Sequence, residues 1–237
     1  MTRSHPATNS TRFTLGVVAG AWLAAYVVAI PIQGLIIGVA GHAGEPSSTW
    51  PTSVTALSAL SLWVCFLAAA VVVSRRFGSG RFAEDFRLTF RIRDLVGLPI
   101  GVGCQLLIPI LYWPLQRIWT ETFRSDELSR RAQDLWDRAD GVWLLVLVAV
   151  VVIGAPLVEE IVYRGMIQQA LHSRIDDPLA VVLSALFFAA IHLQPVEIPG
   201  LFVFGLVAGT CFMRTGRLSV SILVHVGFNA TGLLLVA

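Results

Sequence analysis

The sequence has few charged residues and no lysine. Only 14% of its 237 residues are charged, all seventeen basic residues are arginine, and the formal net charge is +2. We interpret the lack of lysine as compositional bias, and the nearly neutral charge argues against a general nucleic-acid-binding protein. The three cysteines, Cys65, Cys104 and Cys211, lie in different apolar runs without metal-ligand spacing, and no HExxH sequence is present. These absences argue against a disulfide framework and against a standard zinc signature.

What the chain has in excess is apolar sequence. Hydrophobic residues make up 56% of it and the mean hydropathy is +0.75. This composition predicts an all-α polytopic membrane protein with about seven transmembrane helices around an intramembrane polar cavity. The expected spans are Phe13–Gly41, Ser53–Ser74, Leu95–Leu115, Val142–Leu171, Leu179–Leu193, Ile198–Met213 and Leu218–Ala237.

Features between and within these spans predict where helices end and how they are oriented. Pro31 is expected to kink or end the first span. Asp177 is expected to be the N-cap of the fifth span and Pro178 its first helical residue. Gln116–Gly141 is either an amphipathic helix at the membrane interface or a solvated linker helix. The Arg75–Asp94 loop holds six arginines, which favours a cytoplasmic N-terminus in an integral protein of a bacterial cytoplasmic membrane. Met1–Arg12 is interpreted as the polar start of a retained signal anchor.

The fourth predicted span ends in ionisable residues that are costly in lipid. Glu159, Glu160 and Arg164 follow a long apolar run, and such groups usually face a protein interior or a wet cavity. Glu160 and Arg164 are four residues apart, so they share a helix face and can form an ion pair. Glu159 lies about 100° around the axis and lacks that partner. The sequence therefore predicts one paired and one free carboxylate.

The last three predicted spans add two histidines and an amide. His192 follows Phe188 by one helical turn, and His225 precedes Asn229 by one turn. A lone intramembrane histidine or asparagine usually makes a hydrogen bond between helices. Together with the glutamates, however, these groups can activate water and donate hydrogen bonds to an oxyanion. Neutral histidine and carboxylate are also metal ligands, so Glu159, His192 and His225 are candidates for a divalent metal such as zinc.

These residues carry a family resemblance. Glu159-Glu160-x-x-x-Arg164, Phe188-x-x-x-His192 and His225-x-x-x-Asn229 resemble the three motifs of the CPBP intramembrane proteases, which include type II CAAX-prenyl endopeptidases and Abi-like, bacteriocin-processing and immunity relatives. The resemblance covers residues 142–237, which we expect to be the catalytic core. Residues 1–141 are expected to supply transmembrane helices and interfacial segments.

The resemblance implies roles for individual residues. Glu159 would be the general base, His192 would help it to activate water, and His225 with Asn229 would stabilise the oxyanion. Glu160 and Arg164 would be a supporting ion pair, and Phe188 would line the cavity. The family is described both as metal-dependent and as using glutamate alone, so the resemblance leaves a zinc cofactor open.

The function that we expect is that of an intramembrane endopeptidase acting on a membrane-associated polypeptide, with the lipid bilayer as its surroundings and no nucleic-acid partner. Two alternatives remain at this point. One is a non-catalytic binding or immunity scaffold that uses the same cavity, and the other is a small proton-coupled transporter in which Glu159 and His192 relay protons. The sequence does not specify the substrate or the oligomeric state.

Overall fold

The computed structural model describes residues 13–237, and this part of the chain contains helices and no strand. Five helical stretches are long and apolar enough to cross a membrane, and two shorter apolar helices, Asp177–Ile191 and Leu218–Leu234, accompany them. The prediction of an all-α membrane protein is confirmed, with seven as an approximate number of spans. The segment Met1–Arg12 lies outside the described residues.

The elements follow one another along the chain with short connections. In chain order they are α1 (Leu15–Val39), η1 (Ser47–Thr49), α2 (Thr52–Phe77), α3 (Phe82–Asp85), η2 (Ile92–Val96), α4 (Gly97–Ile118), α5 (Ser125–Asp137), α6 (Val142–Val148), η3 (Ala149–Gly154), α7 (Ala155–Glu160), η4 (Ile161–Gln168), α8 (Gln169–His172), α9 (Asp177–Ile191), α10 (Ile198–Thr215) and α11 (Leu218–Leu234).

The elements from α6 to α8 form one continuous helical rod of 31 residues, Val142–His172. Two stretches of this rod, η3 and η4, are π-helical. They flank α7, the α-helical stretch that carries both glutamates. A π-helical insertion changes the direction in which the following side chains point, and such insertions are frequent at functional sites. The rod therefore presents Glu159 and Glu160 from a locally altered helix.

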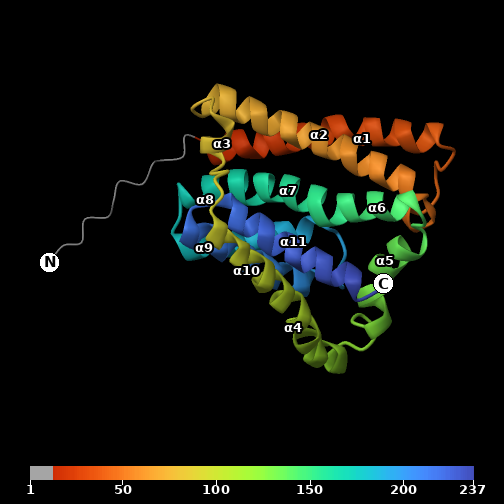
Figure 1. Ribbon diagram of the computed structural model, residues 1–237. Coiled ribbons are helices and arrows are strands. Elements are labelled where there is room, and N and C mark those ends of the chain that lie inside the picture. Colours follow the sequence, from red (N-terminus) through yellow and green to blue (C-terminus); the bar gives the residue numbers. More distant parts are fainter. Residues whose placement is uncertain (1–12) are drawn as a thin grey trace.

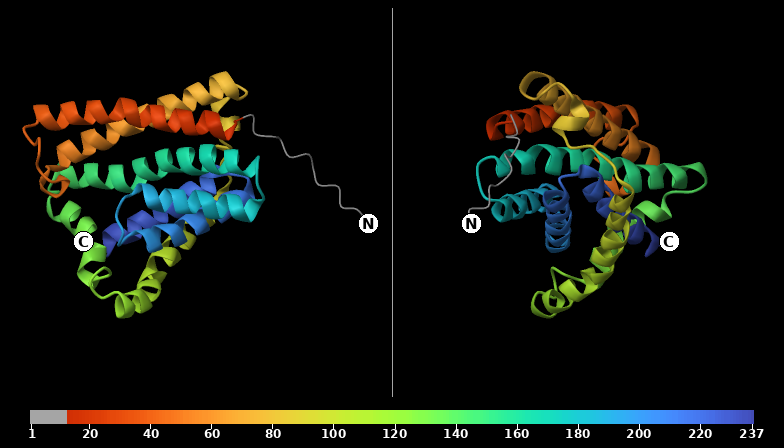
Figure 2. Two further views of the ribbon diagram at one scale, coloured as in Figure 1. Left: turned by 180° about the vertical axis from the view of Figure 1, so that it is seen from behind. Right: turned by 60° about the vertical axis from the view of Figure 1, so that its left-hand side comes forward.

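The rod lies between two groups of helices. The α1–α2 hairpin covers one side of it, and α9, α10 and α11 lie on the other side, with α4 outermost (Figure 1). α4 packs closely on α11 through glycines: a Cβ atom on Gly101 would lie 1.9 Å from the Val224 carbonyl oxygen, and one on Gly227 would lie 2.3 Å from that of Leu98. The second half of α4 then leaves the bundle (Figure 2).

Two of the expected helix features differ from the structure. α1 continues through Pro31 to Val39, so this proline does not end the helix. The N-cap of α9 is Asp176 and not Asp177, which is the first helical residue, so the prediction was wrong by one position. Asp176 has an extended backbone, whereas Asp177 already has helical geometry, and the aspartate pair in the sequence does not distinguish between the two. The segment 116–141 contains the predicted helix as α5.

Candidate active site

Glu159 and His192 lie together in a cavity of about 180 Å³, which we call the Glu159 cavity. The Glu159 side chain is 26% exposed, whereas that of Glu160 is fully buried. The walls come from the rod, from the end of α9 and from the α1–α2 hairpin. The lining residues are Tyr26, Leu62, Trp63, Phe66, Glu159, Val162, Tyr163, Ile191 and His192.

Glu160 accepts hydrogen bonds from three side chains in the interior. Its Oε1 atom lies 2.8 Å from Arg164 Nη1 and 2.8 Å from His225 Nδ1. Its Oε2 atom accepts from the Ser221 hydroxyl, and Ser221 is itself fully buried. A buried carboxylate without partners would be strongly unfavourable, and these three donors satisfy it. The structure thus contains the paired carboxylate that the sequence predicts, with two partners beyond Arg164.

His225 lies between the two glutamates. Its Nδ1 atom is bound to Glu160, and its Nε2 atom lies 3.9 Å from Glu159 Oε2. Because a carboxylate only accepts, Nδ1 carries the proton of that hydrogen bond. Nε2 is therefore the ring atom that faces the free carboxylate.

His192 is oriented by its own helix. It is the C-cap residue of α9, and its Nδ1 atom lies 2.7 Å from the Phe188 carbonyl oxygen. A carbonyl oxygen only accepts, so Nδ1 again carries the proton and Nε2 is left for the cavity. One backbone contact thus sets the tautomer of the histidine that shares the cavity with Glu159.

Phe188 and Arg164 pack against the site from the protein interior. The Arg164 guanidinium lies over the Phe188 ring at 4.6 Å from its centroid and also reaches the Gly205 carbonyl oxygen at 3.4 Å. The Phe188 ring touches His192 in an edge-on contact, with centroids 4.8 Å apart, but it does not line the Glu159 cavity. Phe188 therefore holds His192 from within the core.

Asn229 lies apart from the Glu159 cavity. Its Nδ2 atom donates to the Val151 carbonyl oxygen at 2.8 Å, which ties α11 to the π-helical stretch η3. It lines a different cavity of about 180 Å³, which we call the Asn229 cavity. One of the two amide hydrogens of Asn229 is used in this bond, and the other is left for a further acceptor.

Sequence reasoning missed Ser221 and the residues of α1 and α2 that line the Glu159 cavity. Ser221 precedes His225 by four residues, so the spacing S-x-x-x-H on one helix face was a signal for it. Tyr26, Trp63 and Phe66 line the Glu159 cavity from α1 and α2. No local pattern marks them, because their position depends on how the hairpin packs against the rod.

The candidate metal ligands do not form a site that fits a metal ion. Among the side chains that the structure describes, no group of three or more His, Cys, Asp and Glu residues is arranged so that it could hold one. Glu159 Oε2 and His225 Nε2 are 3.9 Å apart, and each histidine is oriented by a hydrogen bond between its Nδ1 atom and a protein acceptor. The Glu159 cavity is thus lined by one carboxylate and one imidazole among mostly apolar side chains, and His225 Nε2 lies close to the carboxylate.

Comparison with known proteins shows what this part of the chain is similar to. Residues 141–231 match the model of a family described as Rce1-like, type II CAAX prenyl endopeptidase. Neither the curated proteins nor the solved structures gave a match. The matched segment begins just before the rod and contains Glu159, His192, His225 and Asn229. Residues 141–231 are thus similar to the Rce1-like type II CAAX prenyl endopeptidases, which confirms the resemblance to the CPBP intramembrane proteases and supports a protease activity of the CAAX type in general terms.

Proposed function

We propose that the protein is an intramembrane endopeptidase that hydrolyses a peptide bond of a membrane-associated polypeptide. The observation that carries the proposal is the shared cavity of Glu159 and His192, with His225 Nε2 3.9 Å from Glu159 Oε2. Three polar groups around a small volume inside an apolar bundle can hold the water that hydrolysis requires.

In the proposed reaction Glu159 is the general base. It takes a proton from water while the water oxygen bonds to the peptide carbonyl carbon, and it then gives that proton to the departing amine as the C–N bond breaks. His192, whose Nε2 is an acceptor in the neutral ring, orients the same water. The products are a carboxylic acid and an amine.

His225 and Asn229 are proposed to stabilise the developing oxyanion. His225 Nε2, when it carries a proton, is a donor held in place by the bond from Nδ1 to Glu160. Asn229 keeps one amide hydrogen for an acceptor besides Val151. The Glu160–Arg164 pair and Ser221 are positioning groups, because they reach the cavity through His225 and not directly.

The proposed setting is a bacterial cytoplasmic membrane with the N-terminus of the chain in the cytoplasm. Arginines in or beside three connections support it. The turn after α2, the loop before α9 and the turn between α10 and α11 meet at one end of the bundle, where α1 begins (Figure 1). Exposed Arg75, Arg76, Arg174 and Arg214 lie at this end. Clustered arginine favours the cytoplasmic side.

The test is cleavage of a panel of membrane-tethered peptides by the purified protein in lipid vesicles, with and without a chelator. The proposal predicts that at least one peptide is cut, and that His192→Ala abolishes most of the turnover while the protein still folds. Unchanged cleavage in the chelator arm supports glutamate chemistry. A panel that is bound but never cut would contradict the protease proposal and favour a binding scaffold.

A further inference from the structure

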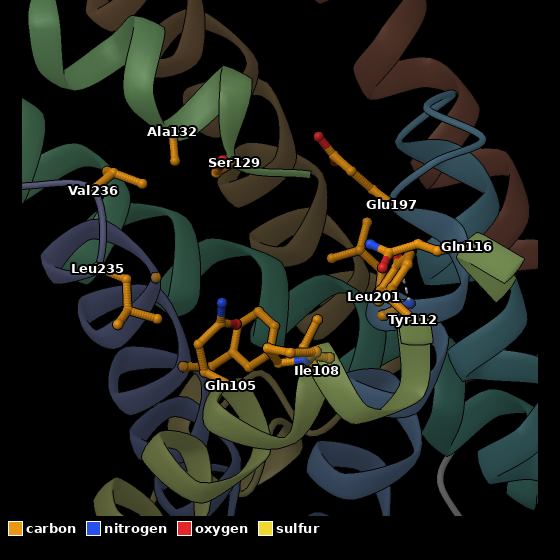
Figure 3. Close-up of a pocket in the computed structure, with 14 residues that line it drawn as sticks. Gln105, Ile108, Tyr112, Gln116, Ser129, Ala132, Glu197, Leu201, Leu235 and Val236 are labelled. Atoms are coloured by element: carbon orange, nitrogen blue, oxygen red, sulfur yellow. Dashed lines mark hydrogen bonds between the residues drawn. The ribbon is translucent and has the colours of Figure 1, made fainter. Parts of the chain in front are cut away.

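A larger cavity lies between α4 and α11. It has a volume of about 540 Å³ and is bounded by α4, α5, α10 and α11; we call it the α4–α11 cavity. Figure 3 shows Leu235 and Val236 on one side, Glu197 and Gln116 on the other, and Gln105 and Ile108 between them. It exists because the glycine contacts hold only the first half of α4 against α11.

The walls of this cavity are fixed by the protein itself. The Tyr112 hydroxyl donates to the Val196 carbonyl oxygen at 2.6 Å and accepts from the Gly200 backbone nitrogen at 3.1 Å, which ties the start of α10 to α4. At the mouth, Arg131 of α5 forms an ion pair with Glu197 at 3.2 Å. The cavity is thus a built feature of the fold and not a gap between loosely placed helices.

The α4–α11 cavity leads toward the proposed catalytic groups. The Asn229 cavity shares four lining residues with it and is also lined by Asn229 and Val151; the shared residues are Gln105, Ala132, Phe228 and Gly232. Asn229 is one helical turn from His225, which in turn faces Glu159. A chain lying in the α4–α11 cavity would therefore reach the amide that is proposed to bind the oxyanion.

The chemistry of the lining fits a polypeptide. Most of the wall is apolar, as Ile108, Phe228 and Leu235 illustrate. Gln105, Gln116 and Ser129 add polar groups for which we find no hydrogen-bond partner among the described residues. An amide side chain pairs with a main-chain amide, whereas a hydrocarbon chain would leave these groups unsatisfied. The lining therefore favours a peptide over a lipid tail.

We propose that the α4–α11 cavity binds an extended segment of the polypeptide substrate on one side of the bond to be cut. This inference rests on the proposed function. The α4 face from Gln105 to Gln116 is about 17 Å long at ~1.5 Å per residue. An extended chain rises ~3.3 Å per residue, so the cavity accommodates about five residues. The substrate requirement is thus a stretch of about five residues next to the scissile bond.

The test uses one peptide that the wild type cuts and two shortened forms, each reduced to two residues on one side of the scissile bond. Shortening the peptide on the side that binds in the α4–α11 cavity is expected to raise KM about tenfold or more. Ile108→Trp, which fills the cavity, is expected to raise KM for the full peptide by a similar factor. It is expected to leave unchanged the KM of the peptide that lacks the segment bound in the cavity. Its control is Leu107→Trp on the exposed face of α4, where Leu107 is 60% exposed.

A second variant fills the same cavity from its α11 wall. The three atoms nearest to a Cβ atom on Gly232 all belong to the Gln105 side chain, the first at 3.4 Å, so Gly232→Leu enters the cavity toward a flexible side chain. It is expected to repeat the Ile108→Trp pattern, with Leu234→Phe on the exposed face of α11 as its control. Equal effects of the filling variants on full and shortened peptides, or no effect on either, would overturn the inference.

Cross-linking separates this inference from the proposed function. A peptide with a photoreactive residue about four positions from its scissile bond is expected to label α4 between Gln105 and Gln116, or α11 beyond Phe228. Labelling without any cleavage would support the substrate-binding cavity and contradict the protease proposal. Cleavage without such labelling, or filling variants that change only the co-purified lipid, would show that the cavity does not bind substrate.

Discussion

The carboxylate of Glu160 connects the ion pair of the rod to the histidine that faces Glu159. Arg164, His225 and Ser221 all donate to it, and all of these side chains are buried. Since Oε1 binds both Arg164 and His225, loss of the charge would weaken both contacts. At this scale the stability of the core and the orientation of His225 depend on the same group.

The variant Glu160→Gln tests this connection. Removing one partner of a buried ion pair leaves Arg164 uncompensated and typically costs about 3–5 kcal/mol. We expect the free energy of unfolding in detergent to fall by about that amount, with a smaller loss of about 1–3 kcal/mol for Ser221→Ala. Denaturant titration followed by circular dichroism measures both.

The control for Glu160→Gln is Glu121→Gln, which makes the same chemical change at an exposed residue between α4 and α5. Exposed substitutions usually stay within about 0.5 kcal/mol. Equal stability of the two glutamine variants would show that the buried network does not hold the core.

At the scale of elements, the packing of α4 on α11 determines where the α4–α11 cavity begins. Gly101 lies against the backbone of α11, whereas a Cβ atom on Gly103, half a turn away, would meet nothing within 4 Å. Gly101 and Gly103 therefore form a matched pair with opposite surroundings.

We expect Gly101→Ala to lower the melting temperature and the cleavage rate, because the added methyl group must push α4 away from α11. Gly103→Ala is expected to be neutral or stabilising by up to about 1 kcal/mol, since alanine favours a helix. Melting of both variants in the same detergent makes the comparison. A Gly101→Ala protein as stable as Gly103→Ala would contradict the close approach of the helices.

Hydropathy predicted where helices occur but not how they pair. The spans in the sequence agree closely with α2, α10 and the rod, because long apolar runs have no alternative in a membrane. The π-helical stretches η3 and η4 had no signal, since they arise from packing within one apolar run. The same holds for Tyr26, Trp63 and Phe66, whereas the motif residues Glu159 and His192 could be found from their spacing.

At the scale of the whole molecule, the N-terminal hairpin completes the Glu159 cavity. Tyr26, Leu62, Trp63 and Phe66 of α1 and α2 line it, although they lie outside residues 141–231, the segment similar to the protease family. Both the expected core of residues 142–237 and the N-terminal part therefore contribute walls to the site.

We expect residues 142–237 produced alone to be inactive, because one wall of the Glu159 cavity would be lipid or detergent. Co-expression of residues 1–141 as a separate chain is expected to restore cleavage, because the α1–α2 hairpin packs against the rod in the same hydrophobic core. Cleavage of the tethered peptide by membranes containing either or both pieces measures this. Full activity of residues 142–237 alone would show that the hairpin is not needed.

The central claim is that Glu159 acts as the base inside the membrane, and its most direct test is single-turnover cleavage by wild type, Glu159→Gln and Glu121→Gln in the same vesicles. Glutamine keeps the shape of the side chain and cannot take a proton, so the account predicts a rate at least ~10²-fold lower for Glu159→Gln. Glu121→Gln is predicted to cleave at the wild-type rate. A Glu159→Gln protein that folds and cleaves as fast as wild type would contradict the account.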